Sequence, residues 1–262
     1  MWAEVQTGDF MPHNYRRYGW IPDLPDARDH VYQLPKKAAA LPSSVDLRTG
    51  CPPVYDQGEL GSCTANAIGA ALEFDQMRQE IAYSVPSRLF IYYNERALEG
   101  SIASDSGAQI RDGIKTVASQ GACPETMWPY VEASFADRPP APCYKYAKLH
   151  PAVQYARVAQ DAGQMKAVLA AGFPIVAGIT VYESFESDDV AKSGIVPMPG
   201  ADEAALGGHA VMAVGYNDAS QRYLVRNSWG TGWGMGGYFT IPYAYLTESD
   251  LADDFWVIRV VK

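Results

Sequence analysis

The apolar pattern changes halfway along the chain, and this change constrains the fold more than any other feature. Between residues 41 and 150 apolar residues recur at helical spacing, whereas short runs of strand character dominate after residue 150. Helices followed by strands predict an α+β fold with two lobes, a helical lobe over residues 41–150 and a β lobe over residues 151–262. We expect an active site to lie in the cleft between these lobes.

The same pattern gives the individual elements. Helices are predicted at residues 64–77, 86–98, 109–119 and 164–171. Strands are predicted at residues 152–158, 174–181, 209–216, 223–226, 237–241 and 255–261. Residues 1–40 differ from both lobes, because their prolines and aromatic residues indicate an extended segment.

A cysteine stands at the predicted start of the first helix, at the end of the run Gln57-Gly-Glu-Leu-Gly-Ser-Cys63. Unpaired backbone N–H groups and the helix dipole favour negative charge at a helix start, so we expect a lowered pKa for the Cys63 thiol. The Gln57 side-chain amide and the Cys63 backbone N–H are suited to bind an oxyanion. The run therefore predicts a nucleophile with its electrophilic support.

A thiolate nucleophile needs a base, and His209 is the histidine with the most suitable surroundings. Two glycines precede it, and an apolar run with strand character follows it. Asn227 comes eighteen residues later and is expected to accept a hydrogen bond from one imidazole nitrogen, which fixes the tautomer. Trp229 is expected to keep water away from that bond.

Together these motifs resemble the active-site blocks of papain-like cysteine peptidases. The matching blocks are Gln57…Cys63, Gly208-His209-Ala-Val with the Val-Gly-Tyr that follows, Asn227-Ser-Trp-Gly with the later Trp-Gly and Gly-Tyr, and the opening Leu41-Pro-Ser-Ser-Val-Asp-Leu-Arg. The resemblance spans residues 41–262 and is nearest to the bacterial, xylellain-like branch with short N-terminal extensions. It implies a papain-like two-lobe fold whose C-terminal lobe is antiparallel and β-barrel-like. It also implies peptide hydrolysis through a thioester on Cys63, with His209 as acid and base, Asn227 as its orienter and Gln57 in the oxyanion hole.

Several positions depart from the usual family pattern. Thr64 follows the predicted nucleophile where plant and lysosomal members usually have tryptophan. Leu60 and the loop 103–109 lack the two cysteines that form a disulfide in those members, and the paired loss leaves the fold prediction intact. The distance to Asn227 is slightly long, which we interpret as an insertion within residues 184–206.

By resemblance, the substrate-binding residues are small: Gly107, Ala108, Gly178, Gly207 and Gly208, with Trp229 beside them. Gly107 is expected on the cleft floor, where the substrate backbone would add as an extended strand. The pocket walls predict a roomy, apolar site for the second side chain before the cleaved bond. The chain shows neither a histidine-rich loop at residues 184–206 nor a terminal carboxylate that would close one end of the cleft, so we expect an endopeptidase.

Two other functions use the same residues. A transpeptidase or other acyltransferase would pass the thioester to an amine, and a non-catalytic papain-like binding domain would use only the cleft. Joint retention of Gln57, Cys63, His209 and Asn227 argues against the binding domain. The run at residues 232–237 formally matches a dinucleotide-binding glycine pattern, but it does not connect a strand to a helix within a βαβ unit.

The composition excludes other classes of partner. A net charge of −9 without a long basic run argues against nucleic acid, and no apolar run reaches the length of about 18 residues that a membrane span requires. We expect no metal, no organic cofactor, a peptide or protein substrate, and a monomer. Residues 1–9 do not resemble a signal peptide. The location stays open between secreted or periplasmic, if a signal was removed, and cytoplasmic.

Three cysteines remain once Cys63 is assigned to catalysis. Cys51, Cys123 and Cys143 can form at most one bridge within the chain, and the sequence does not choose among the pairs. Free thiols are expected if the protein is cytosolic, and the spacing does not match a zinc site.

The N-terminal segment is too short for the helical pro-segment that family members commonly carry. An extended aromatic segment can still occupy a groove built for extended peptide. We therefore expect residues 15–30 to lie over the Cys63–His209 cleft and restrict substrate entry. The alternative is a strap that packs along the back of the lobes.

Overall fold

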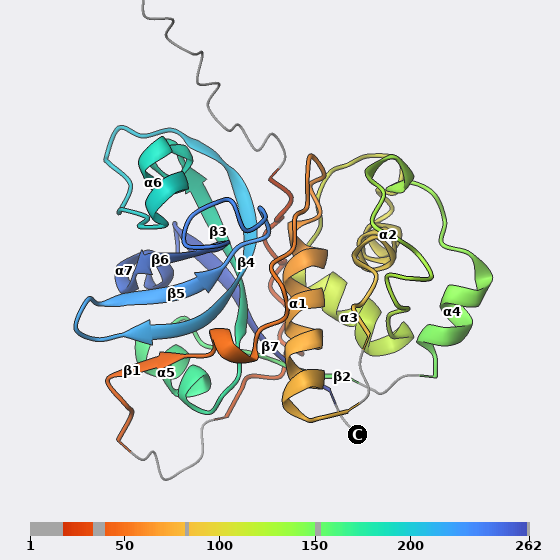
Figure 1. Ribbon diagram of the computed structural model, residues 1–262, viewed down its shortest axis with the longest axis horizontal. Coiled ribbons are helices and arrows are strands. Elements are labelled where there is room, and N and C mark those ends of the chain that lie inside the picture. The colour runs from red at the N-terminus through yellow and green to blue at the C-terminus, as the bar shows by residue number, and fades with distance from the viewer. Residues whose placement is uncertain (1–17, 34–39, 82–83, 150–152, 261–262) are drawn as a thin grey trace, which may run out of the picture.

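In the computed structural model, which describes residues 18–33, 40–81, 84–149 and 153–260, a group of helices lies beside a large antiparallel sheet (Figure 1). This arrangement confirms the α+β class, while the lobe boundaries at residues 40 and 150 stay a prediction. The helices beside the sheet are α1 (Cys63–Arg78), α2 (Arg88–Glu99), α3 (Ile110–Gln120) and α4 (Ala141–Ala147). Three others lie among the strands: α5 (Ala162–Ala170), α6 (Asp188–Ser193) and α7 (Tyr243–Thr247).

The strands form one seven-stranded sheet in the order β2-β7-β3-β4-β5-β6, with β1 paired to β4. Every pair is antiparallel. Within the described part of the chain no pairing joins β2 to β6, so the sheet is open and only loosely barrel-like. The strands are β1 (Ser44–Asp46), β2 (Val153–Arg157), β3 (Ile175–Tyr182), β4 (Ala205–Asn217), β5 (Arg222–Arg226), β6 (Tyr238–Pro242) and β7 (Ala252–Val260).

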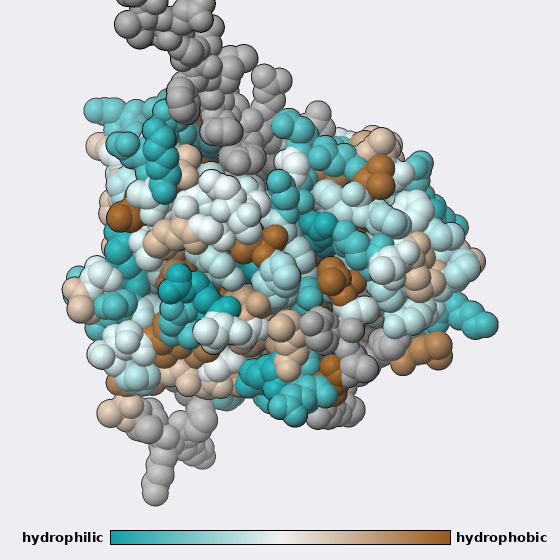
Figure 2. Space-filling model, in the orientation of Figure 1, coloured by the Kyte–Doolittle hydropathy of each residue, from teal (hydrophilic) through white to brown (hydrophobic). Residues whose placement is uncertain are grey.

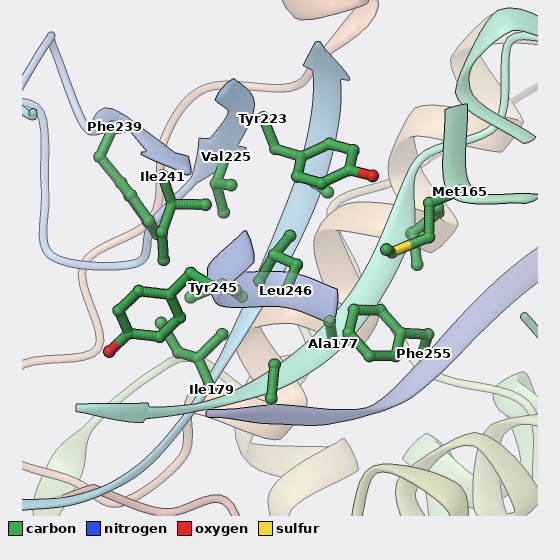
Figure 3. Packing of buried hydrophobic residues seen from close by; sticks show 14 of the residues in the cluster. Met165, Ala177, Ile179, Tyr223, Val225, Phe239, Ile241, Tyr245, Leu246 and Phe255 are labelled. Atoms are coloured by element: carbon green, nitrogen blue, oxygen red, sulfur yellow. The ribbon is translucent and has the colours of Figure 1, made fainter. Parts of the chain in front are cut away.

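Burial on both faces explains the unbroken apolar run in β4. Ala210, Met212 and Val214 belong to the hydrophobic cluster that joins the sheet to α1, α2 and α3. Val211 and Ala213 belong to a second cluster on the opposite face, as the alternation of side chains along a strand requires. Figure 3 shows part of the second cluster, in which Phe255, Ala177 and Met165 come from β7, β3 and α5.

Helix α1 is the central element of the fold. All its residues from Cys63 to Asp75 are buried, with α2 and α3 on one side and β4 and β7 on the other. The small side chains of Ala67, Ala70 and Ala71 allow this close approach to the sheet. The predicted nucleophile therefore begins an element that is held on several sides.

The N-terminal segment, residues 18–33, runs between β4 and α1 in Figure 1. Its later part pairs with β2, because Tyr32 N–H donates to the Arg157 carbonyl at 2.8 Å and Arg157 N–H donates to the His30 carbonyl at 2.7 Å. This part of the segment follows the edge of the sheet, as expected for a strap. The earlier residues take a different path, described with the site below.

No helix in the described residues is long and apolar enough to cross a membrane. On the face drawn in Figure 2, apolar side chains gather only in small, separate patches.

Candidate active site

Cys63 is the first residue of α1 and is fully buried. The backbone N–H groups of Ala210, Gly19 and Thr64 approach its sulfur. Ala210 follows His209 on β4, so the packing of α1 against this strand brings the predicted nucleophile next to the predicted base. The sequence alone placed these two residues in different lobes, and the structure brings them together.

His209 is also fully buried, and its orientation is fixed by Asn227. Its Nε2 lies 2.8 Å from Asn227 Oδ1. The same oxygen accepts the Ser228 backbone N–H at 2.8 Å, which identifies it as the amide oxygen and makes His209 Nε2 the donor. Nδ1, the other ring nitrogen, has no hydrogen-bond partner in the described residues and is left as the acceptor for a thiol proton.

Trp229 covers the His209–Asn227 pair. Its ring stacks on the imidazole with a centroid distance of 4.8 Å and an interplanar angle of 29°. Phe185 and Trp233 contact the other sides of Trp229, and Trp229 itself is only 4% exposed. This stacking and burial are compatible with the predicted exclusion of water from the pair, and that role and substrate binding by Trp229 both stay predictions.

Three neighbours hold Gln57, two through its side-chain amide and one through its backbone carbonyl. The Ser228 hydroxyl donates to Gln57 Oε1 at 2.6 Å, and Gln57 Nε2 donates to the Leu60 carbonyl at 2.9 Å. The Tyr130 hydroxyl fixes the Gln57 backbone carbonyl at 2.8 Å. The amide nitrogen carries a second hydrogen, which is available to a substrate oxyanion near Cys63.

The expectation of a lowered pKa for Cys63 is wrong for this arrangement. Burial raises the pKa of the Cys63 thiol to about 12, and the three backbone N–H groups offset only part of that effect. Burial also lowers the pKa of His209 to about 4, against the hydrogen bond to Asn227. A dry surrounding disfavours both charged forms, so the pair rests here as a neutral thiol and a neutral imidazole.

Residues 18–21 of the N-terminal segment produce this burial, and we call them the arm. The Ala108 N–H donates to the Gly19 carbonyl at 2.8 Å, and the Ile21 N–H donates to the Ala108 carbonyl at 3.0 Å. On the opposite side, the Trp20 N–H donates to the Gly208 carbonyl at 3.0 Å. The arm therefore lies as an extended strand between the α3 side and β4, directly over Cys63.

The glycines predicted to bind substrate contact the arm in this structure, and their substrate role stays a prediction. A β-carbon at Gly178 would lie 1.9 Å from the Trp20 ring, and one at Gly107, where φ is +76°, would lie 2.2 Å from the Gly19 carbonyl oxygen. Gly207 and Gly208 would collide in the same way with Tyr18 and Trp20. The absent side chains thus create the groove that the arm fills.

The pocket that receives Trp20 ends in the carboxylate of Asp254. The sequence predicted a roomy, apolar pocket and did not include this acid. Trp20 Nε1 donates to Asp254 Oδ2 at 3.0 Å, and the Asp23 backbone N–H donates to the same oxygen at 2.7 Å. Asp254 is fully buried and has a φ of +57°. Sequence reasoning missed Asp23 and Asp254, since nothing in their spacing shows that they are buried together.

In the described residues, no group of histidine, cysteine or acidic side chains could hold a metal ion.

Comparison with known proteins supports the geometry. A model of the papain family of cysteine proteases matches residues 41–255. The crystal structure of xylellain, a cysteine protease from Xylella fastidiosa, is 45% identical with a TM-score of 0.88, covering 94% of this chain and 96% of that chain. An uncharacterized peptidase C1-like protein of Acanthamoeba polyphaga mimivirus is 45% identical over 94% of this chain and 88% of its own length.

A more distant relative, cysteine proteinase 3 of Entamoeba histolytica, is 27% identical over 85% of this chain and 69% of its own length. The match to the family model spans most of the chain and includes Cys63, His209 and Asn227. The fold is papain-like, and the expected resemblance to the xylellain-like branch is confirmed. The chain belongs to the papain family of cysteine proteases.

Proposed function

We propose that this cysteine peptidase cleaves internal peptide bonds with Cys63 as the nucleophile and His209 as the acid and base, and that its N-terminal segment restrains the activity. The observation that carries the proposal is the position of Cys63 against the Ala210 N–H, directly after His209, with the imidazole bonded to Asn227 and Gln57 bonded to the neighbouring Ser228. Membership of the papain family supports peptide hydrolysis as the reaction.

The proposed reaction assigns a role to each side chain of the site. His209 Nδ1 takes the Cys63 proton, and the thiolate attacks the peptide carbonyl carbon. Gln57 and the Cys63 backbone N–H bind the oxyanion. The imidazolium then gives its proton to the leaving amine, and a water molecule that His209 deprotonates hydrolyses the thioester. Asn227 keeps the imidazole in the required tautomer.

Acyl transfer to an amine would proceed through the same thioester. It differs only in the last step, in which an amine attacks in place of water. No contact in the described residues forms a dedicated amine site, so hydrolysis is the function we propose first.

The way the arm meets the nucleophile supports a restraint that is not itself cleaved. The arm presents the Gly19 backbone N–H to the Cys63 sulfur, whereas attack requires a carbonyl carbon. Its bonds with Ala108 and Gly208 use backbone groups that an extended substrate would need. Because the arm belongs to the same chain, weak contacts suffice to hold it.

A cluster of charged side chains fastens the segment that follows the arm. Asp23 Oδ1 accepts the Arg111 backbone N–H at 3.1 Å, and Asp23 Oδ2 accepts Trp256 Nε1 at 2.9 Å. Arg157 reaches Asp254 at 2.9 Å and Asp23 at 3.8 Å. Arg111 also pairs with Asp29 at 2.7 Å, and Asp253 pairs with Arg157 at 2.8 Å.

The cluster holds more carboxyl groups than cations, and this affects protonation. Burial, followed by repulsion from Asp254, raises the pKa of Asp23 to about 7. Burial also raises the pKa of Asp254. Between about pH 4 and 7, Asp23 therefore keeps a proton that it would release if the segment moved into water.

The first prediction concerns the catalytic roles. Cys63→Ala is expected to abolish peptide hydrolysis, because no other group can form the thioester. Asn227→Ala is expected to keep partial activity with kcat reduced about 10- to 100-fold, because the imidazole still reaches the thiol but is less well oriented. Steady-state kinetics on a fluorogenic peptide and circular dichroism of each variant measure this. Full activity of folded Cys63→Ala protein would remove the assignment.

The second prediction concerns the position of cleavage. Mass spectrometry of a digested peptide library is expected to show internal cuts, because the loop at residues 184–206 has no histidine for terminal recognition. Added amine nucleophile is expected to leave hydrolysed products dominant. Release of only single residues or dipeptides from one terminus would contradict the endopeptidase, and dominant amine adducts would favour the acyltransferase.

The third prediction concerns the arm. Gly19→Ala would place a β-carbon 1.7 Å from the Gly61 carbonyl oxygen, and Trp20→Ala would empty the pocket at Asp254. Each is expected to speed labelling of Cys63 by an epoxide thiol reagent at least tenfold, which corresponds to about 1.4 kcal/mol of lost arm binding. Leu24→Ala, at an exposed position of the same segment, is the matched control. Unchanged rates in both test variants would assign the segment to a structural strap.

The fourth prediction concerns pH. Asp23 has a pKa of about 7 with the segment in place and 3.8 as a free side chain. Protonation of Asp23 therefore stabilises the closed state, in which the arm covers Cys63. This stabilisation is complete below pH 3.8 and is lost as the pH rises through 7. Proton transfer from Cys63 to His209 releases no proton. Labelling of Cys63 is therefore expected to accelerate by up to about tenfold per pH unit between pH 4 and 7.

Two matched proteins test the origin of that slope. Asp23→Asn is expected to show a shallower labelling profile over the same range, because burial still raises the pKa of Asp254, and a protein lacking residues 1–36 is expected to show a nearly flat one. The same steep slope in both would show that another group controls opening.

A further inference from the structure

Two buried cysteines lie together outside the active site. Cys123 and Cys143 are both fully buried and share a small hydrophobic cluster with Phe90 and Ala147. Both are free thiols in this structure, and the two side chains lie in one small cluster and interact electrostatically. Helix α4 carries Cys143, which comes 20 residues after Cys123. Nothing in the peptidase reaction uses either thiol.

The remaining non-catalytic cysteine lies elsewhere. Cys51 is half-buried, and its thiol donates to the Leu47 carbonyl at 3.5 Å, near Arg226 and Tyr238. It shares no cluster with the other two cysteines. Of the pairs that the sequence left open, the described residues thus bring together only Cys123 and Cys143.

We infer that Cys123 and Cys143 form a structural disulfide when the chain folds in the presence of a disulfide oxidant such as oxidised glutathione. One thiolate attacks a glutathione sulfur and releases one reduced glutathione. The second thiolate then displaces the other glutathione, so two thiols are oxidised and one glutathione disulfide is reduced. Since both sulfurs are buried in the folded chain, the reaction precedes the docking of α4.

The proposed bridge would close the loop 123–143, which braces the oxyanion side of the active site. Tyr130 in this loop donates to the Gln57 backbone carbonyl at 2.8 Å and lies 2.6 Å from the Ser62 hydroxyl. Glu132 accepts the Glu59 backbone N–H at 3.3 Å. The loop therefore contacts the segment from Gln57 to Cys63 near both ends of that segment.

Other contacts also hold both ends of the loop. The Cys123 carbonyl accepts the Ser87 N–H at 2.8 Å, and Pro124 pairs with Pro86. At the other end, the Tyr144 hydroxyl of α4 donates to Asn94 at 3.2 Å, and Cys143 lies in the small cluster. A bond between the sulfurs would tie the two ends directly to each other and restrict the unfolded chain as well.

The test uses Cys63→Ala protein folded in a glutathione buffer, so that the active-site thiol does not interfere. Alkylation with iodoacetamide under denaturing, non-reducing conditions is expected to modify one cysteine, Cys51, and to modify all three after reduction. Peptide mapping is expected to find Cys123 linked to Cys143. Three modified cysteines without reduction, or a bridge to Cys51, would overturn the inference.

Thermal unfolding gives a second readout on the same protein. Reduction is expected to lower its Tm on the order of 5–10 °C, as for a loop of this length in a chain of this size. A matched Cys51→Ser variant in the same background should keep that difference, and a Cys123→Ser variant should lose it. An equal Tm with and without reductant in a protein that mapping shows to be bridged would remove the stabilising role. Neither readout depends on peptidase activity.

Discussion

The packing of α1 across β4 is the contact on which the rest of the structure depends. It joins the helices to the sheet through one shared cluster, in which Ala67 and Ala70 of the helix meet Met212 and Val214 of the strand. The same contact sets the first residue of α1 beside the strand residue that follows His209. Nucleophile and base come from elements far apart in the sequence, so an error in this packing would separate them.

In the proposed restraint, the arm excludes water from Cys63 and His209 in addition to blocking the groove sterically. Charged cysteine and histidine need solvent or a close partner, and the arm supplies neither because it meets Cys63 with apolar contacts and a single N–H. Desolvation then outweighs the helix start, which by itself favours a thiolate. We propose that the triad is fully assembled in this structure but unreactive, because its thiol and imidazole are neutral. We expect that removal of the arm restores the ion pair without movement of the triad.

The sequence predicted the elements that carry strong periodicity. The helix expected at residues 64–77 is Cys63–Arg78, and the strand expected at 174–181 is Ile175–Tyr182. Strand β4 begins at Ala205, earlier than the predicted start at residue 209, because Gly207 and Gly208 also pair with β3. Short elements such as α4 and α6 were missed, since a few residues carry no readable period.

The residues of the site were likewise identified from the sequence only in part. Cys63, His209, Asn227 and Gln57 were identified by their motifs, and the structure brings all four together. The pKa of Cys63 was predicted in the wrong direction, because the prediction counted the helix start but not the burial of the thiol, although residues 15–30 were expected over the cleft. The carboxylates of Asp23 and Asp254 were missed for the same physical reason: burial of two acids together depends on contacts between distant segments.

NMR of selectively labelled histidine measures the protonation state of His209, on which the proposed effect of the arm depends. In the full chain at pH 6, we expect a neutral imidazole with its proton on Nε2, because the pKa of His209 lies near 4 under the arm. After removal of residues 1–36, we expect an imidazolium paired with the Cys63 thiolate at the same pH. An imidazolium in both proteins would contradict the proposed restraint, since the arm would then leave the catalytic pair charged.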